Sequence, residues 1–294
     1  MSWHPAALYT RLALRVRRGM GERAGERRFP GRPQAAGIEL EAYRPYTPGD
    51  DLRHLDWHAL GRLDVLLVRR YTAEREVLFH LLVDGSASMD VPASDGKLAA
   101  ARKLAMALAW VALGSNDAVR VALLPGGGRA PVVSPVHRRR ASIHRVGELL
   151  DGAGAAGALD LGAVLEAHAR YHRAPGAALV ISDFMTDPAG LERGVLALRA
   201  RRWEVALLQV LARGELEPAF TGGVLADVES GATHPIALTP ALRARYRALL
   251  AGHLAALRAV AERTQAPYAC LVAGDSLPDF VAVELGRLGL VRRR

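Results

Sequence analysis

The sequence predicts an α/β fold: a doubly wound, mostly parallel sheet with helices on both faces, preceded by a small β-rich attachment. The prediction rests first on alternation, because from Val77 onward short apolar runs take turns with longer alanine- and leucine-rich segments. It rests secondly on the run from Val77 to Val83, which is almost uniformly apolar. Uniformly apolar runs are typical of strands that are buried on both faces of a parallel sheet.

The elements expected in this main region follow from the same patterns. Parallel strands are expected at 77–84, 118–124, 177–182, 204–210 and 268–272, with a short antiparallel edge strand at 131–136. Helices are expected at 98–113, 142–150, 161–171, 188–200, 242–263 and 279–288, and a hairpin at 225–238. No internal repeat and no second large domain are visible in the sequence.

The region before residue 77 divides into two parts. Residues 1–36 are expected to form an N-terminal helix over Pro5–Arg18, with one apolar stripe, followed by a basic linker rich in glycine, arginine and proline. Residues 37–76 are expected to form the small β-rich attachment, with strands at 38–43 and 65–71 and a helix from Asp51 that Asp50 caps. The third region, 77–294, is the main domain.

Composition limits the class of protein. The net charge is +9 and is carried almost wholly by arginine, since Lys97 and Lys103 are the only lysines. Such a balance favours nucleic acid, an anionic membrane surface or an acidic protein as the partner. The single cysteine, Cys270, excludes an internal disulfide framework. No apolar run reaches the roughly 18 residues of a membrane span, so we expect a cytoplasmic protein.

Polar residues follow two of the expected strands at the point where each strand ends. Asp84, Ser86 and Ser88 follow the first strand, and Asp183 follows the strand at 177–182. The carboxyl ends of parallel strands meet at one edge of a sheet, where open α/β folds place their ligands. All four side chains offer oxygen, the donor preferred by Mg²⁺ and Mn²⁺. The sequence therefore predicts a hard-cation site, whereas helix capping and a turn would be the purely structural explanation.

Residues 77–272 resemble a von Willebrand factor A domain, a Rossmann-like fold, and Asp84, Ser86 and Ser88 match its metal-ion-dependent adhesion site. The preceding stretch, 37–57, resembles the bacterial family catalogued as "domain of unknown function 58", most specifically in Tyr46-Thr47-Pro48-Gly49-Asp50-Asp51-Leu52-Arg53-His54-Leu55-Asp56-Trp57. The resemblance implies partnership with a MoxR-type AAA+ ATPase. It also implies that the serines bind the cation directly and leave one coordination position for a partner's carboxylate.

One loop departs from the pattern of the resembling sites. Those sites add a threonine or serine from the loop before the third helix, where this chain has Gly157-Ala158-Leu159-Asp160-Leu161-Gly162. No hydroxyl stands at the matching place. Asp160 could substitute as an oxygen ligand, but the favoured role is capping the helix that begins at Leu161.

The leading hypothesis is a non-enzymatic protein-interaction module that binds an acidic partner. One alternative is a nucleic-acid-binding protein that uses the arginine surface, although no reading motif supports it. The other is a metal-dependent phosphotransfer or hydrolytic enzyme, which would need a nucleophile and a general acid beside the cation. His54 and His58 have the spacing of helical zinc ligands, but a structural or surface role is favoured because no H-E-x-x-H motif is present.

Overall fold

The computed structural model describes residues 5–15, 38–73, 76–91, 93–152, 154–172, 174–218, 222–227, 232–237 and 239–294. The chain divides into two compact units, one formed by residues 1–22 and 77–294 and the other by residues 23–76. The basic linker expected before residue 36 lies outside the described residues.

The larger unit is built on a six-stranded sheet. Its strands are β4 (Leu78–Gly85), β5 (Ala118–Pro125), β6 (Val132–Val133), β7 (Ala177–Ser182), β8 (Glu204–Leu211) and β11 (Tyr268–Val272), in the order β11-β8-β7-β4-β5-β6. All neighbours pair in parallel except β6, which is an antiparallel edge strand. The predicted fold class, α/β with a doubly wound and mostly parallel sheet, is confirmed.

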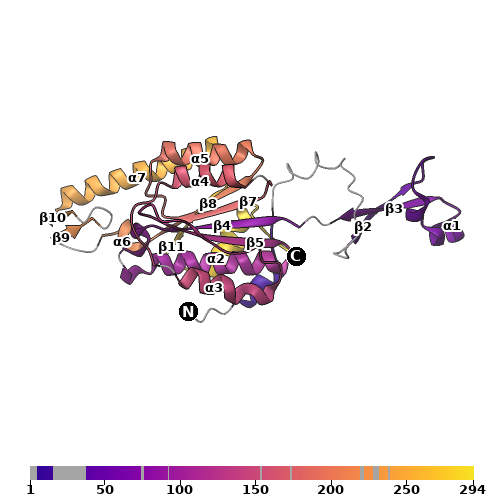
Figure 1. Ribbon diagram of the computed structural model, residues 1–294, viewed down its shortest axis with the longest axis horizontal. Helices are drawn as coiled ribbons and strands as arrows, with labels where there is room; N and C mark the ends of the chain where they lie inside the picture. Colours follow the sequence, from indigo (N-terminus) through magenta and orange to yellow (C-terminus); the bar gives the residue numbers. More distant parts are fainter. Residues whose placement is uncertain are drawn as a thin grey trace. The chain divides into compact units, whose positions relative to one another are not determined.

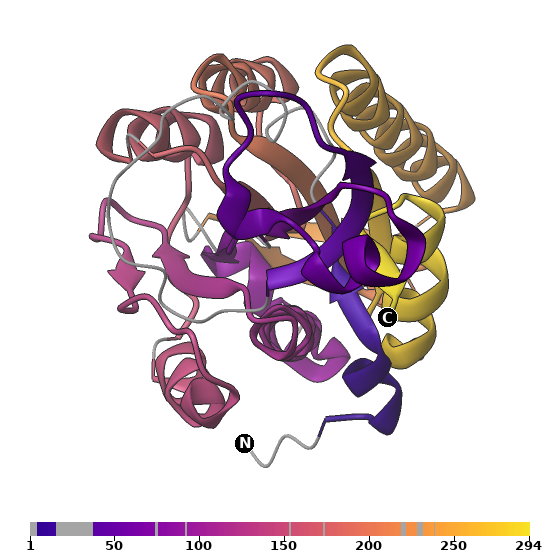
Figure 2. The ribbon, with the colours of Figure 1, turned by 90° about the vertical axis from the view of Figure 1, so that its right-hand side faces the viewer.

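Helices cover both faces of this sheet, as the two views in Figures 1 and 2 show. One face packs on α2 (Lys97–Gly114) and α3 (Ile143–Asp151), and the other on α4 (Leu161–Tyr171), α5 (Pro188–Ala200) and α7 (Pro240–Arg263). Alternate residues of β4 serve the two cores, with Leu81 and Val83 on the α2 face and Leu82 on the α4 face. Nearly every position of the central strands is buried, which explains their uniformly apolar sequences.

The chain reverses its direction of travel through the sheet between β4 and β7. From β4 it passes to β5 on one side, and later returns to β7 on the other. Such a switch point leaves a crevice outside the carboxyl ends of the two strands. Asp84 lies at the carboxyl end of β4, and Asp183 directly follows β7. These are the two carboxylates singled out in the sequence.

The prediction of a helix over Pro5–Arg18 is wrong. Residues Ala7–Arg11 form a 3-10 helix, and Leu12–Leu14 form strand β1, which pairs antiparallel with β12 (Val291–Arg293) near the end of the chain. Tyr9, Leu12 and Leu14 are buried in the core that α2 covers. The apolar stripe is therefore core-facing, and this segment belongs to the larger unit.

The remaining elements of the larger unit follow the sequence closely. Helix α4, strand β7 and helix α5 begin and end at the expected residues. The expected hairpin is present as β9 (Gly222–Ala226) and β10 (Thr233–Ala237). The C-terminal helix is continuous but irregular, made of α8 (Leu277–Asp279), a π-helical turn (Phe280–Glu284) and α9 (Leu285–Arg287), with a short α6 (Arg213–Leu216) after β8.

The two strands expected at 38–43 and 65–71 are present in the smaller unit as β2 (Ile38–Pro45) and β3 (Leu67–Ala73), and they pair antiparallel. The helix of this unit differs from the prediction. Asp51 caps a 3-10 turn over Leu52–His54, and Asp56 caps α1 (Trp57–Leu63). Asp50, which was expected to be the cap, forms a two-point ion pair with Arg44 instead. This ion pair holds the pKa of Asp50 well below its usual range.

Among the described residues, no helix combines the length and the apolar character needed to cross a membrane.

Glycines set the closeness of α4 and α5, and this gives a test of the packing. A Cβ added at Gly162 would lie 2.4 Å from the backbone oxygen of Gly190. We expect Gly162→Ala to lower the free energy of unfolding by about 1–3 kcal/mol, because the two helices must separate. Gly252→Ala is the control, since a Cβ there meets nothing within 4 Å; it should raise stability by up to about 1 kcal/mol. Urea denaturation measures both, and equal effects would contradict the packing described.

Candidate cation-binding site at the carboxyl edge

The turn after β4 gathers three of the four predicted site residues. Asp84 is the penultimate residue of β4, and its Oδ1 accepts a hydrogen bond from the backbone N–H of Ser86 at 2.8 Å. The hydroxyls of Ser86 and Ser88 are hydrogen bonded to each other at 3.1 Å. Ser88 lies in the 3-10 turn over Ala87–Asp90, and Ser86 is the residue that immediately precedes this turn.

Asp183 reaches the same edge from β7, as the sequence predicted. Its neighbour Ser182 donates its hydroxyl to Oδ2 of Asp84, which links the ends of the two strands. Oδ1 of Asp183 accepts the backbone N–H of Met185 at 3.0 Å, and its carbonyl accepts the side chain of Gln209 at 2.7 Å. Asp84 and Asp183 are respectively 4% and 2% exposed, so both carboxylates are withdrawn from water.

A lysine that is not among the four predicted site residues completes the site. Lys97, the first residue of α2, is 1% exposed, and its Nζ donates to Oδ2 of Asp183 at 2.9 Å and to Oε1 of Glu215 in α6. Glu215 is fixed in turn, because its other carboxylate oxygen accepts the backbone N–H of Ala212 at 2.7 Å. Lys97, Asp183 and Glu215 are called the buried ion triad below.

The charges of this cluster do not cancel when all its groups are ionised. Three carboxylates, Asp84, Asp183 and Glu215, face one ammonium, that of Lys97, which leaves a charge of two negative units. Burial alone would lower the pKa of Lys97, but the carboxylates more than offset it, so the pKa is raised and the ammonium stays charged. Burial, followed by the nearby Asp183 carboxylate, raises the pKa of Asp84, against hydrogen bonds from Ser182 and Ser86.

The donor set fits a hard cation. It consists of two adjacent hydroxyls and two carboxylates, with no thiol or imidazole bonded to them among the described residues, and the excess negative charge matches a divalent ion. Lys97 competes for the same charge, because it already occupies one oxygen of Asp183. The metal assignment of Asp84, Ser86, Ser88 and Asp183 stays a prediction.

The loop that lacks the expected hydroxyl lies directly against the serine turn. The backbone N–H of Ala87 donates to the carbonyl of Gly157 at 2.9 Å, and that of Ala156 donates to the carbonyl of Gly85 at 2.9 Å. Gly157 has a φ of 63°, a conformation that favours glycine. Asp160 caps α4 by accepting the N–H of Ala163 at 3.0 Å. The loop thus contributes backbone contacts to the edge, and its carboxylate is used for capping.

Two groups of buried polar side chains were not predicted from the sequence. Lys97 and Glu215 are 118 residues apart, and no local pattern joins them. A second group, His80, His168 and His172, lies together on the α4 face of the sheet. The four-residue spacing of His168 and His172, at the end of the helix expected over 161–171, is a usable signal. The same spacing drew attention to His54 and His58, of which His58 is exposed.

Removal of the buried ammonium should be costly, and the second lysine provides the control. Lys97→Met would leave Asp183 and Glu215 buried without their cation, and we expect it to lower the free energy of unfolding by about 3–5 kcal/mol. Lys103 is exposed on the same helix, so Lys103→Met should change stability by less than about 0.5 kcal/mol. Chemical denaturation at neutral pH measures both. A Lys97→Met protein as stable as wild type would show that the triad is not a stabilising unit.

Comparison with known proteins places the chain in a family. Solved structures similar to this chain include the conserved hypothetical protein BatB from Bacteroides thetaiotaomicron (15% identity, 72% of this chain and 98% of that chain, TM-score 0.45). They also include the SpRpn10 VWA domain (12% identity, 70% and 94%, TM-score 0.35). Uncharacterized proteins of Mycobacterium tuberculosis (Rv1480) and Mycobacterium bovis (Mb1516) are each 34% identical over 225 residues, 74% of this chain and 69% of theirs. The family model described as "Protein of unknown function DUF58" matches residues 42–256, and the chain belongs to this family.

Proposed function

We propose that this protein is a non-enzymatic protein-interaction module that binds an acidic residue of a partner at the carboxyl edge of its sheet. The proposed partner is a MoxR-type AAA+ ATPase, for which the protein acts as an adaptor. The observation that carries the proposal is the convergence of Asp84, Ser86, Ser88 and Asp183 at the switch point between β4 and β7.

A cation at this edge would explain the preference for an acidic partner. In the proposed site, Mg²⁺ or Mn²⁺ is held by Ser86 and Ser88, with Asp84 and Asp183 close by. Hydroxyl ligands carry no charge, so the ion stays electrophilic and attracts a carboxylate from outside. The chain's net charge of +9 would steer an acidic surface towards it.

The hydrogen bonds at the edge support binding rather than catalysis. Ser182 donates to Asp84, and Ser86 and Ser88 bond to each other. Among the described hydrogen bonds, the imidazole of His253 reaches the backbone carbonyl of Phe184, next to Asp183, and not a serine. A nucleophile activated by an adjacent base is therefore not assembled in the part of the chain that the structure describes.

The partnership can be tested with the purified full-length chain and a MoxR-type ATPase from the same genome. We expect the wild type to capture the ATPase in the presence of Mg²⁺ and to lose at least tenfold in affinity in EDTA. Asp84→Ala should lose a similar factor, because the carboxylate that holds the serine turn is removed. Asp279→Ala removes an exposed carboxylate and should bind as wild type does. Binding curves from surface plasmon resonance give all four affinities.

The outcomes separate the parts of the proposal. Equal binding by wild type and Asp84→Ala would contradict the metal mechanism, and no binding by either would contradict the partnership. Binding of DNA or RNA that weakens steeply with salt and is unchanged in Asp84→Ala would favour the nucleic-acid alternative. Turnover of a generic phosphoester that depends on Asp84 would favour the enzymatic one.

A further inference from the structure

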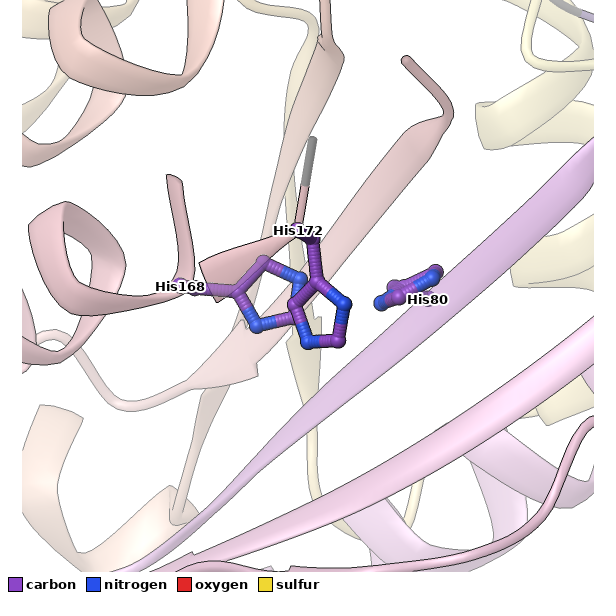
Figure 3. Close-up of side chains that lie close together, drawn as sticks. All are labelled: His80, His168 and His172. Atoms are coloured by element: carbon purple, nitrogen blue, oxygen red, sulfur yellow. The ribbon is translucent and has the colours of Figure 1, made fainter. Parts of the chain in front are cut away.

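A cluster of three histidines lies on the α4 face of the sheet, in a group separate from the carboxyl-edge site. His80 comes from β4, while His168 and His172 come from the last turn of α4 and the residue that follows it (Figure 3). One ligand nitrogen from each of the three residues lies within 4.8 Å of the others. The cluster joins a central strand to the helix that covers it.

The sequence places these rings together in a simple way. His168 and His172 are four residues apart, so a helical turn brings them to the same side, with ring centroids 4.3 Å apart. His80 lies two residues from Leu82, and side chains two apart on a strand face the same way, towards α4. Its ring lies 4.9 Å from each of the other two, in an edge-on arrangement.

We propose that His80, His168 and His172 form a binding site for a first-row transition-metal ion of the zinc class. Three imidazoles with one remaining coordination position are a donor set that suits Zn²⁺. A tetrahedral site with Zn–N bonds of about 2.0–2.1 Å needs the ligand nitrogens about 3.4 Å apart, which inward rotation of the rings would supply.

Two further observations point to a ligand rather than to packing alone. His80 is 1% exposed, and its Nδ1 is buried with no hydrogen-bond partner among the described residues; the same holds for Nε2 of the half-buried His168. A buried polar nitrogen without a partner is costly, and a metal ion would satisfy it. Burial, helped by the neighbouring imidazoles, lowers the pKa of His80 to about 3 and that of His168 to about 4. Both rings are therefore neutral at pH 7, the state that binds metal.

The surroundings limit the strength and the role of such a site. Arg120 of β5 lies beside His80 in the sheet, and its positive charge contributes to the lowered histidine pKa values. The same charge would oppose a dication, so we expect weaker binding than at a site that includes a carboxylate. Trp203 closes the cluster on another side, with its ring 4.7 Å from that of His80. A bound ion would link α4 to β4 and so stabilise their contact. It would reach the site past the partly exposed His172.

Metal binding can be measured directly on the full-length chain, freed of metal by EDTA and carrying no affinity tag. We expect one equivalent of Zn²⁺ in calorimetry and a rise in the thermal midpoint, because an ion that binds only the folded state stabilises it. Co²⁺ in its place should give the intense visible absorption of a four-coordinate nitrogen site. His172→Ala and His168→Ala should each weaken Zn²⁺ binding at least tenfold.

A control separates this site from other sources of zinc affinity. His144→Ala removes an exposed histidine that lies outside both proposed cation sites, and it should bind Zn²⁺ as wild type does. Wild type that takes up no Zn²⁺, or uptake that is unchanged in both His168→Ala and His172→Ala, would overturn the proposal and leave the histidines as a packing cluster. Either result leaves the proposed partner binding at Asp84 to be judged by its own experiment.

Discussion

The buried ion triad is the interaction on which the carboxyl edge depends. Lys97 begins α2, Asp183 follows β7 and Glu215 lies in α6, so one ammonium connects three elements that are far apart in the sequence. An ammonium without exposure to water is stable only with such partners. Asp183, held by this contact, lies close enough to Asp84 to raise the pKa of its carboxyl group, and the hydrogen bond from Ser182 to Asp84 links the ends of β4 and β7.

This arrangement gives the edge both rigidity and residual charge. Four hydrogen-bond donors hold the carboxylates of Asp84 and Asp183 in place. They are the backbone N–H groups of Ser86 and Met185, the hydroxyl of Ser182 and the ammonium of Lys97. One positive charge does not balance three negative ones, however. Replacing such a cluster with well-packed apolar residues is often neutral or stabilising. In the proposed function, a further cation would balance the uncompensated charge, with the two adjacent serine hydroxyls as oxygen ligands.

Much of this could be predicted from local sequence patterns. The first and last residues of strand β7 and of helices α4 and α5 were predicted correctly. The spacing of apolar residues indicates the same boundaries as the capping aspartates and the proline at the start of α5. Asp84 and Asp183 could be paired because parallel strands end at one edge. The structure of the N-terminal segment could not be predicted in this way, since Leu12–Leu14 becomes a strand only through pairing with Val291–Arg293. Lys97 was not predicted as a site residue for a related reason, because no local sequence pattern indicates that its partners are Asp183 and Glu215. The histidine cluster likewise needs β4 and α4 to be in contact.

The central claim is that the carboxyl edge of the sheet is the surface that meets the partner. Hydrogen–deuterium exchange of the full-length chain, alone and saturated with the MoxR-type ATPase in Mg²⁺, tests it most directly. The account predicts slower exchange in residues 84–90, 156–160 and 183–187, which form the edge, and unchanged exchange in residues 174–177 at the opposite end of β7. Protection at residues 174–177, with the three edge segments unchanged, would contradict it.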